Sequence, residues 1–208
     1  FLATGTVFAV TTNITQLSIT TGPQTVVTGT VSAVITVQTQ NIGSTSETLD
    51  TPGTNLLLNS SSPTGEFSSN AEVWVPVPSL GMNNGTANRS FYYKDTTIGT
   101  HTITVTADGQ TWTAAIQTIV VNGPVTNDEA ESYTTIQAAI DGTDAGGTIT
   151  AAAGTYVENV SLDAKTNLTI QGAGDTTIIE PASGIGFAIK NSSGITIKNL
   201  KIHEKEEC

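Results

Sequence analysis

The chain has 208 residues, only 12% of them charged, and a formal net charge of −11 at pH 7. No ionisable side chain precedes Glu47, and Arg89 is the only arginine. This balance argues against nucleic-acid binding, which needs a basic surface to neutralise phosphates. Val, Ile and Thr are abundant, and these residues favour strands. We therefore expect an all-β protein.

Three features bear on the compartment. Cys208 is the only cysteine, so an internal disulfide and a zinc site built from cysteines are both excluded; an exposed terminus and an intermolecular disulfide stay open. No run of 18 apolar residues occurs, so we expect no membrane span. We expect Phe1 to be a start left by removal of a leader peptide, and hence a secreted, extracellular or cell-surface protein.

The first part of the chain reads as short strands separated by turns. Val31, Ala33, Ile35 and Val37 alternate with other residues and predict one buried strand face. Asp108-Gly109 predicts a type I′ hairpin between His101–Ala107 and Thr111–Val121. Such spacing favours a β-sandwich. Further strands are expected at Thr6–Thr12, Gln16–Thr20, Asn55–Asn59, Ala71–Val75 and Arg89–Lys94.

Several motifs follow one another between Gln16 and Val121. They are Gly22-Pro23-Gln24-Thr25-Val26 leading into a Ser-x-x-Ile-Thr-Val strand, Leu58-Asn59-Ser60-Ser61-Ser62, Phe91-Tyr92-Tyr93-Lys94-Asp95, and Gly99-Thr100-His101-Thr102-Ile103. In this order they resemble the immunoglobulin-like surface modules of bacteria and archaea. Such modules are spacers and adhesive domains, so the resemblance implies no chemistry.

The pattern changes after Asn122–Glu131, where Gly123-Pro124 and an acidic, turn-rich stretch predict a boundary. A helical period then predicts a short amphipathic helix near Tyr133–Asp141, with Ser132 as its N-cap. Short β runs recur beyond it at intervals of roughly 20 to 25 residues, the cadence of a stacked solenoid. The runs are Thr148–Ala152, Val157–Leu162, Asn167–Gln171, Thr176–Glu180, Gly186–Lys190 and Gly194–Ile202.

Motifs in this second part include Tyr133-Thr134-Thr135-Ile136-Gln137-Ala138-Ala139-Ile140, Gly147-Thr148-Ile149, Ala153-Gly154-Thr155-Tyr156-Val157-Glu158-Asn159-Val160 and Asn167-Leu168-Thr169-Ile170-Gln171-Gly172. They resemble the N-terminal cap of the pectin-lyase-like right-handed β-helix superfamily, except that Gly147 replaces the usual acidic residue. The expected organisation is an N-terminal strand at 1–12, an immunoglobulin-like β-sandwich at 13–122, a linker at 123–131 and a short right-handed parallel β-helix with an N-terminal cap helix at 132–208.

Enzymes of the resembled superfamily use calcium with a basic residue, commonly Arg, or paired carboxylates. The segment after residue 131 contains no arginine, and its acidic residues Asp141, Asp144, Glu158, Asp163, Asp175 and Glu180 are scattered. We therefore expect no enzyme, no catalytic or metal-binding residue and no cofactor. Calcium at the acidic stretch Asp128–Glu131 stays open, against a solvated loop.

Other candidate side chains favour structural roles. We expect His101 and His203 to be exposed, and Trp74 and Trp112 to be core residues rather than a sugar-stacking platform. Seven Asn-x-Ser/Thr sequons are candidate N-glycosylation sites, although a Thr-rich chain also generates sequons passively. They lie at Asn13, Asn59, Asn84, Asn88, Asn159, Asn167 and Asn191.

The favoured hypothesis is a non-catalytic structural subunit of an extracellular filament or surface appendage, a homopolymer assembled by strand exchange. Thr6 to Val10 alternate without charge or proline, so Val7, Phe8, Ala9 and Val10 are expected to form the donor strand. An ordinary first strand of the same sandwich is the alternative. The alternative function is an adhesin or glycan-binding fragment of a longer surface β-helix protein, and a polysaccharide lyase is weaker still. A short solenoid needs its end covered, by more chain, by the charged tail or by another subunit.

Overall fold

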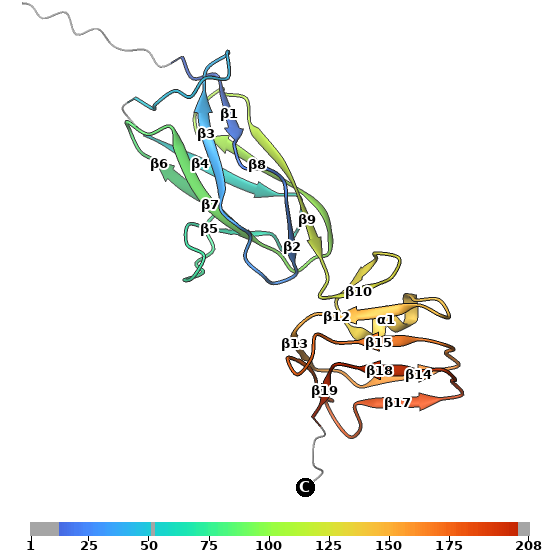
Figure 1. The fold of residues 1–208 in the computed structure, drawn as a ribbon. Helices are drawn as coiled ribbons and strands as arrows, with labels where there is room; N and C mark the ends of the chain where they lie inside the picture. The colour runs from blue at the N-terminus through green and yellow to red at the C-terminus, as the bar shows by residue number, and fades with distance from the viewer. Residues whose placement is uncertain (1–12, 51–52, 204–208) are drawn as a thin grey trace, which may run out of the picture. The chain divides into compact units, whose positions relative to one another are not determined.

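The structure is a computed structural model that describes residues 13–50 and 53–203. These residues contain 19 strands and one short helix, so the prediction of an all-β protein is confirmed. The chain divides into two compact units, Phe1–Val121 and Asn122–Cys208. Figure 1 labels the helix and most of their strands. The strand expected at Thr6–Thr12 lies outside the described residues.

Two sheets form the first unit. In order across the sheet, the four-stranded one contains β1 (Gln16–Ile19), β3 (Ile35–Gln40), β7 (Asn88–Lys94) and β5 (Glu66–Ser68). The five-stranded one contains β2 (Gln24–Val27), β9 (Ala115–Asn122), β8 (Gly99–Ala107), β4 (Thr54–Ser60) and β6 (Ser79–Met82).

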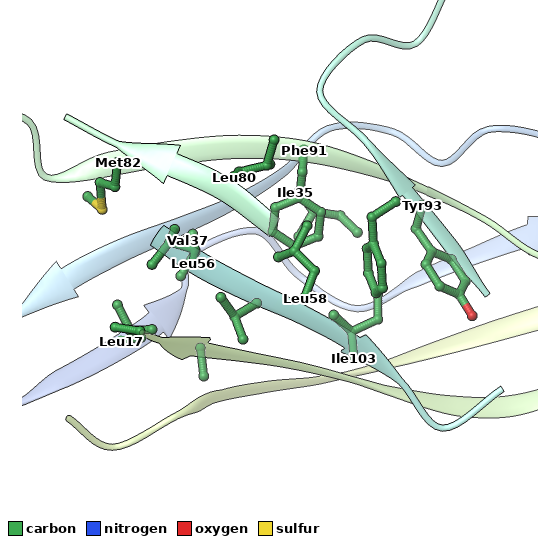
Figure 2. Close-up of a cluster of buried hydrophobic side chains, with 14 of the residues drawn as sticks. Leu17, Ile35, Val37, Leu56, Leu58, Leu80, Met82, Phe91, Tyr93 and Ile103 are labelled. Carbon is green, nitrogen blue, oxygen red and sulfur yellow. The ribbon is translucent and has the colours of Figure 1, made fainter. Parts of the chain in front are cut away.

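Both sheets contribute to a single apolar core. Successive side chains of a strand point to opposite faces, so Ile35 and Val37 of β3 share one face, and both are fully buried. Phe91 of β7 packs edge-on against Phe67, with 5.8 Å between ring centroids. Figure 2 shows these strands and Ile103 of the other sheet meeting in the core.

The buried face of β3 begins later than the alternation predicts. Val31 is half-buried and Ala33 is exposed. The cause is a shift at Ser32, whose N–H donates to the Tyr93 carbonyl (2.8 Å) and whose Oγ accepts from the Tyr93 N–H (2.9 Å). Ile35 pairs with Phe91, so a regular ladder would place Ala33 opposite Tyr93. One extra residue reverses which side chains face inward.

Two further expectations for the first unit are wrong. The segment Ala71–Val75 forms no strand, because Asn70 Oδ1 accepts the N–H groups of Glu72 (2.8 Å) and Val73 (3.1 Å) and turns the chain. The β8–β9 connection is a loop over residues 108–114 rather than a two-residue turn. Only Gly109 has positive φ there (+68°), whereas a type I′ turn needs two such residues.

Residues 122–203 of the second unit form three sheets. The first has the order β11 (Ser132–Tyr133), β10 (Val125–Asn127), β12 (Thr148–Ala151), β15 (Thr169–Gln171) and β18 (Thr196–Lys198). The second has β13 (Gly154–Tyr156), β16 (Thr177–Ile179) and β19 (Lys201–Ile202), and the third has β14 (Val160–Asp163) and β17 (Phe187–Lys190).

Strands from β12 onward recur in the same order and pair in parallel. We call β12, β13 and β14 the first row, β15, β16 and β17 the second, and β18 and β19 the third; β12, β15 and β18 lie side by side in Figure 1. The register aligns like with like, since Ile149 pairs with Ile170 and Ile170 with Ile197. We call such a set of paired residues a column.

The start of the second unit differs from expectation. The predicted linker at 123–131 contributes β10, which pairs with β11 and β12. Helix α1 spans Ile136–Gly142, and its N-cap is Thr135, whose side chain accepts from the Ala138 N–H, while Ser132 lies in β11. The predicted apolar helix face is confirmed for Ile136, Ala139 and Ile140, which are fully buried. At Gly147 a Cβ would lie too close to Thr143 Cγ2, so an acidic side chain there would require Thr143 to move.

Candidate functional site: the open edge of the second unit

Within the described residues, the second unit ends on strands whose apolar side chains are partly exposed. In one column Ile149 and Ile170 are fully buried, whereas Ile197 is only partly buried. In another, Leu162 is fully buried and its partner Ile189 is 49% exposed. Strands β17, β18 and β19 are the outermost members of their sheets. We call these three strands the open edge; an unpaired strand edge is a template for another strand.

The opposite end of the same unit is closed by α1, whose two ends are both held by charged side chains. The Glu158 carboxylate accepts the N–H groups of Ile136 and Gln137, each at 2.9 Å. Lys165 Nζ donates to the Ile140 carbonyl at 2.6 Å. An anion at the N-terminus and a cation at the C-terminus both match the helix dipole. Helix α1 therefore covers the end of the unit that lies opposite β17, β18 and β19 in the order of the rows.

Other acidic side chains of the second unit contact separate partners. Asp141 Oδ1 accepts from Gln137 Nε2 (3.0 Å), and Asp163 Oδ1 accepts from Asn191 Nδ2 (2.9 Å). Asp175 forms an exposed ion pair with Lys201 (3.2 Å). These contacts give the scattered carboxylates structural partners. That the chain is not an enzyme stays an expectation.

The acidic stretch after β10 forms a tight turn held by Glu131. Its carboxylate accepts from the Tyr133 hydroxyl (2.5 Å) and from Asn127 Nδ2 (3.2 Å). The hydrogen bond to Glu131 raises the pKa of Tyr133 to about 12. Within residues 13–50 and 53–203, no group of three or more His, Cys, Asp or Glu side chains is placed to hold a metal. Calcium here therefore gains no support from the geometry.

A polar network is buried at one edge of the first unit's core. Asp95 accepts from the Tyr93 hydroxyl (2.5 Å), from Thr64 Oγ1 (2.5 Å) and from the Thr97 N–H (2.9 Å). Burial opposes ionisation most strongly, yet these hydrogen bonds together hold the pKa of Asp95 below its usual value. His101 Nε2 lies 3.8 Å from Asp95 Oδ2, and its side chain is 12% exposed. The expectation that His101 is exposed is therefore wrong, whereas His203 is exposed.

Trp74 is not a core residue. It is half-buried, its Nε1–H donates to Glu66 Oε2 (2.9 Å), and Lys94 Nζ lies 4.5 Å from the ring centroid. Glu66 also lines two neighbouring hollows of about 300 and 510 Å³. Trp112 is partly buried and packs against the core, nearer to the expectation. Trp74 itself lines neither hollow and is linked to them only through Glu66.

All seven sequon asparagines are exposed: Asn13, Asn59, Asn84, Asn88, Asn159, Asn167 and Asn191. Not all of their amides are equally available. Asn159 Nδ2 donates to the carbonyls of Ser183 (2.5 Å) and Ile185 (3.0 Å), so the fold uses the atom to which a glycan would attach. Asn191 Nδ2 is likewise bound by Asp163, as noted above. The predicted donor residues Val7, Phe8, Ala9 and Val10 lie outside the described residues.

No helix in the described part of the chain is long and apolar enough to cross a membrane.

No protein-family model and no curated protein matches the chain. Among solved structures, domains 4 and 5 of the S-layer protein SbsC align with 53% of this chain at 14% identity and a TM-score of 0.37, and the chain spans 53% of that structure. A CARDB domain from Pyrococcus furiosus aligns with 53% of this chain and 94% of its own length, at 18% identity and a TM-score of 0.32. A conjugative transposon lipoprotein from Bacteroides eggerthii aligns with 52% of this chain and 96% of its own length, at 14% identity and a TM-score of 0.34.

Proposed function

We propose that the protein is a secreted, non-catalytic structural subunit of an extracellular filament or surface appendage. The observation that carries the proposal is the distribution of charge, because no ionisable side chain precedes Glu47. An uncharged segment rich in strand-favouring residues is suited to pairing with a strand of another chain.

In this proposal the two units have different roles. The first unit is an immunoglobulin-like sandwich acting as a spacer. The rows of the second unit are turns of a short right-handed β-helix with α1 as its cap. The partner strand comes from residues 1–12 of a neighbouring subunit, which contain no charged side chain. Strand addition in trans satisfies backbone groups and buries alternate side chains of the donor.

Deletion of residues 1–12 tests the proposal. Electron microscopy of the purified full chain should show filaments, and the deletion variant should give folded monomers by circular dichroism and light scattering. The sandwich core lies within residues 14–121, so the deletion leaves it intact. Filament assembly by the deletion variant at the parent's rate and yield would refute strand exchange by this segment.

A second candidate function is an adhesin or glycan-binding fragment, and the position of Trp74 favours it. The half-buried indole donates to Glu66, and Glu66 also lines the two hollows described above. Glycan-array binding by the parent, lost in Trp74→Ala and kept in Trp112→Phe, would support this candidate. Absence of binding to any glycan would leave the structural role as the better account.

A further inference from the structure

The five-stranded sheet of the first unit has an outward face without a charged side chain. Alternate residues of its strands are buried in the core, so the residues between them point outward. We call the outward set the threonine face, because threonine is its commonest residue. Its members are Thr25 and Val27 of β2, Asn55, Leu57 and Asn59 of β4, Ser79 and Gly81 of β6, Thr100, Thr102, Thr104 and Thr106 of β8, and Ile116, Thr118 and Val120 of β9.

Strand pairing arranges these side chains in rows across the sheet. Thr104 of the central strand β8 pairs with Ile116 on one side and with Asn59 on the other. Thr106 likewise pairs with Leu57. Leu57 is 42% exposed and Ile116 is 66% exposed, so apolar side chains lie in water beside hydroxyl groups. Exposed apolar side chains without charged neighbours are typical of the centre of a protein–protein interface.

The outward face of the other sheet differs in charge and in its internal contacts. It carries the ion pair of Lys94 with Glu66 (3.7 Å). Across the same face the hydroxyl oxygens of Thr36 and Ser90 lie 2.9 Å apart, so these two side chains bind each other. The threonine face is therefore not simply what any sheet of this chain presents to solvent.

The charge of the chain favours a second copy as the partner of this face. Each copy carries a net charge of −11, so contacts elsewhere bring like charges together. Two threonine faces can meet with no charge on either side. We propose that two copies of the chain pack with their threonine faces together, in a two-fold contact that uses the same surface twice. The contact is independent of the strand exchange proposed above, because residues 1–12 take no part in it.

The composition of the face separates this contact from the glycan-binding candidate. A sugar ring stacks on an aromatic side chain, and the threonine face contains none. Sheets of a sandwich, in contrast, pack face to face through aliphatic and β-branched side chains at about 10 Å. Residues such as Leu57, Ile116 and Val120 suit that kind of packing.

The size of the threonine face predicts a weak contact. Five strands about 4.8 Å apart span about 19 Å, and four outward residues of β8, about 6.8 Å from one to the next, span about 20 Å. The projected area is about 400 Å² on each copy, below the roughly 800 Å² per partner of a standard interface. We therefore expect a dissociation constant on the order of 100 µM in solution. Copies that are already held close together in a polymer would strengthen the contact.

Two substitutions that add the same charge test the contact in the full chain. Ile116→Glu places a carboxylate on the threonine face, whereas Ser90→Glu places one at an exposed position of the other sheet. Sedimentation velocity over a range of concentrations, after filaments are removed by centrifugation, gives the dissociation constant of the dimer. Ile116→Glu should raise it at least about tenfold, and Ser90→Glu should change it less than about twofold. Equal effects, or a parent that stays monomeric up to about 1 mM, about ten times the expected constant, would overturn the proposal.

The response to salt is a second measurement on the same dimer. The two faces are uncharged and the remaining surfaces repel each other, so raising the salt concentration from about 0.05 M to about 0.5 M should tighten the dimer by screening. An association that weakens with salt would indicate ion pairs between the copies and contradict the proposal.

A thiol cross-linker locates the contact on the chain. In a Cys208→Ser background, Thr104→Cys introduces the only thiol, at the middle of the face. A bismaleimide that reaches about 10 Å, the spacing of packed sheets, should join these copies into dimers at least about tenfold faster than copies with Ser90→Cys. Filaments in which Thr104→Cys stays uncross-linked would overturn the inference and leave strand exchange standing. Cross-linked dimers without filaments would do the reverse. Cross-linking that appears only after deletion of residues 1–12 would show that this segment covers the face, and would overturn the inference.

Discussion

Truncating the paired side chains Leu162 and Ile189 should lower the stability of the second unit by different amounts. Leu162 is fully buried, and its partner Ile189 is 49% exposed. In the monomer, Leu162→Ala should lower the free energy of unfolding by about 3 kcal/mol, through lost apolar contact and the cavity left behind. Ile189→Ala removes a side chain that is already half in water, so its cost should be about 1 kcal/mol.

Urea denaturation can assign these losses to the right unit. Trp74 and Trp112 both lie in the first unit, so indole fluorescence reports only on that unit. Amide hydrogen exchange of β14 and β17 reports on the second. Neither substitution should shift the urea concentration at the midpoint of the fluorescence transition. Amide hydrogen exchange in β14 and β17 should become faster in both variants, and more so in Leu162→Ala than in Ile189→Ala.

Assembly should change this order. If a strand covers Ile189 in the filament, Ile189→Ala should become costlier there, and the difference should appear as filament dissociation at lower urea. Equal costs for the two substitutions in the monomer would refute the argument that the column is covered at one member and open at the other. An Ile189→Ala cost that stays the same in filament and monomer would show that β17 is uncovered in the filament.

Three other outcomes are expected. Glu158→Ala should lower the free energy of unfolding of the second unit by about 2 kcal/mol, because two charge-assisted hydrogen bonds at the start of α1 are lost. A thermal melting curve that matches the parent's would contradict this. The pKa of Tyr133 in the folded protein, about 12, exceeds its ordinary value of 10.0, so its stabilising contribution holds below pH 10 and fades as pH rises towards 12; Glu131→Gln should lower this pKa in an ultraviolet titration. In a host that N-glycosylates, peptide mass spectrometry should find sugar on Asn84 and none on Asn159, whose amide is bound within the fold.

Strand positions in the second unit followed well from the sequence where β-branched residues were dense. The runs predicted at Thr148–Ala152 and Thr176–Glu180 contain β12 and β16. The run predicted at Gly194–Ile202 is instead two strands, because Asn199 adopts φ of +56° and turns the chain between them. Strand β13 was missed, since it has three residues and begins at Gly154. Short strands that begin with glycine leave little local signal.

The candidate site was harder to predict, because it depends on pairing between distant residues. Nothing near Glu158 in the sequence indicates that its carboxylate accepts hydrogen bonds from the first N–H groups of a helix that begins at Ile136. The Asx turn at Asn70 competes with a segment whose composition favours a strand, and the local hydrogen bonds prevail.

The distribution of charge fits assembly at one defined place. The first 46 residues carry no ionisable side chain, and the whole chain carries a net charge of −11. A net charge of this size opposes indiscriminate association between copies. Uncharged segments rich in strand-favouring residues otherwise promote aggregation. If the chain assembles as proposed, repulsion over the rest of the surface would favour the one contact in which side chains match over all others.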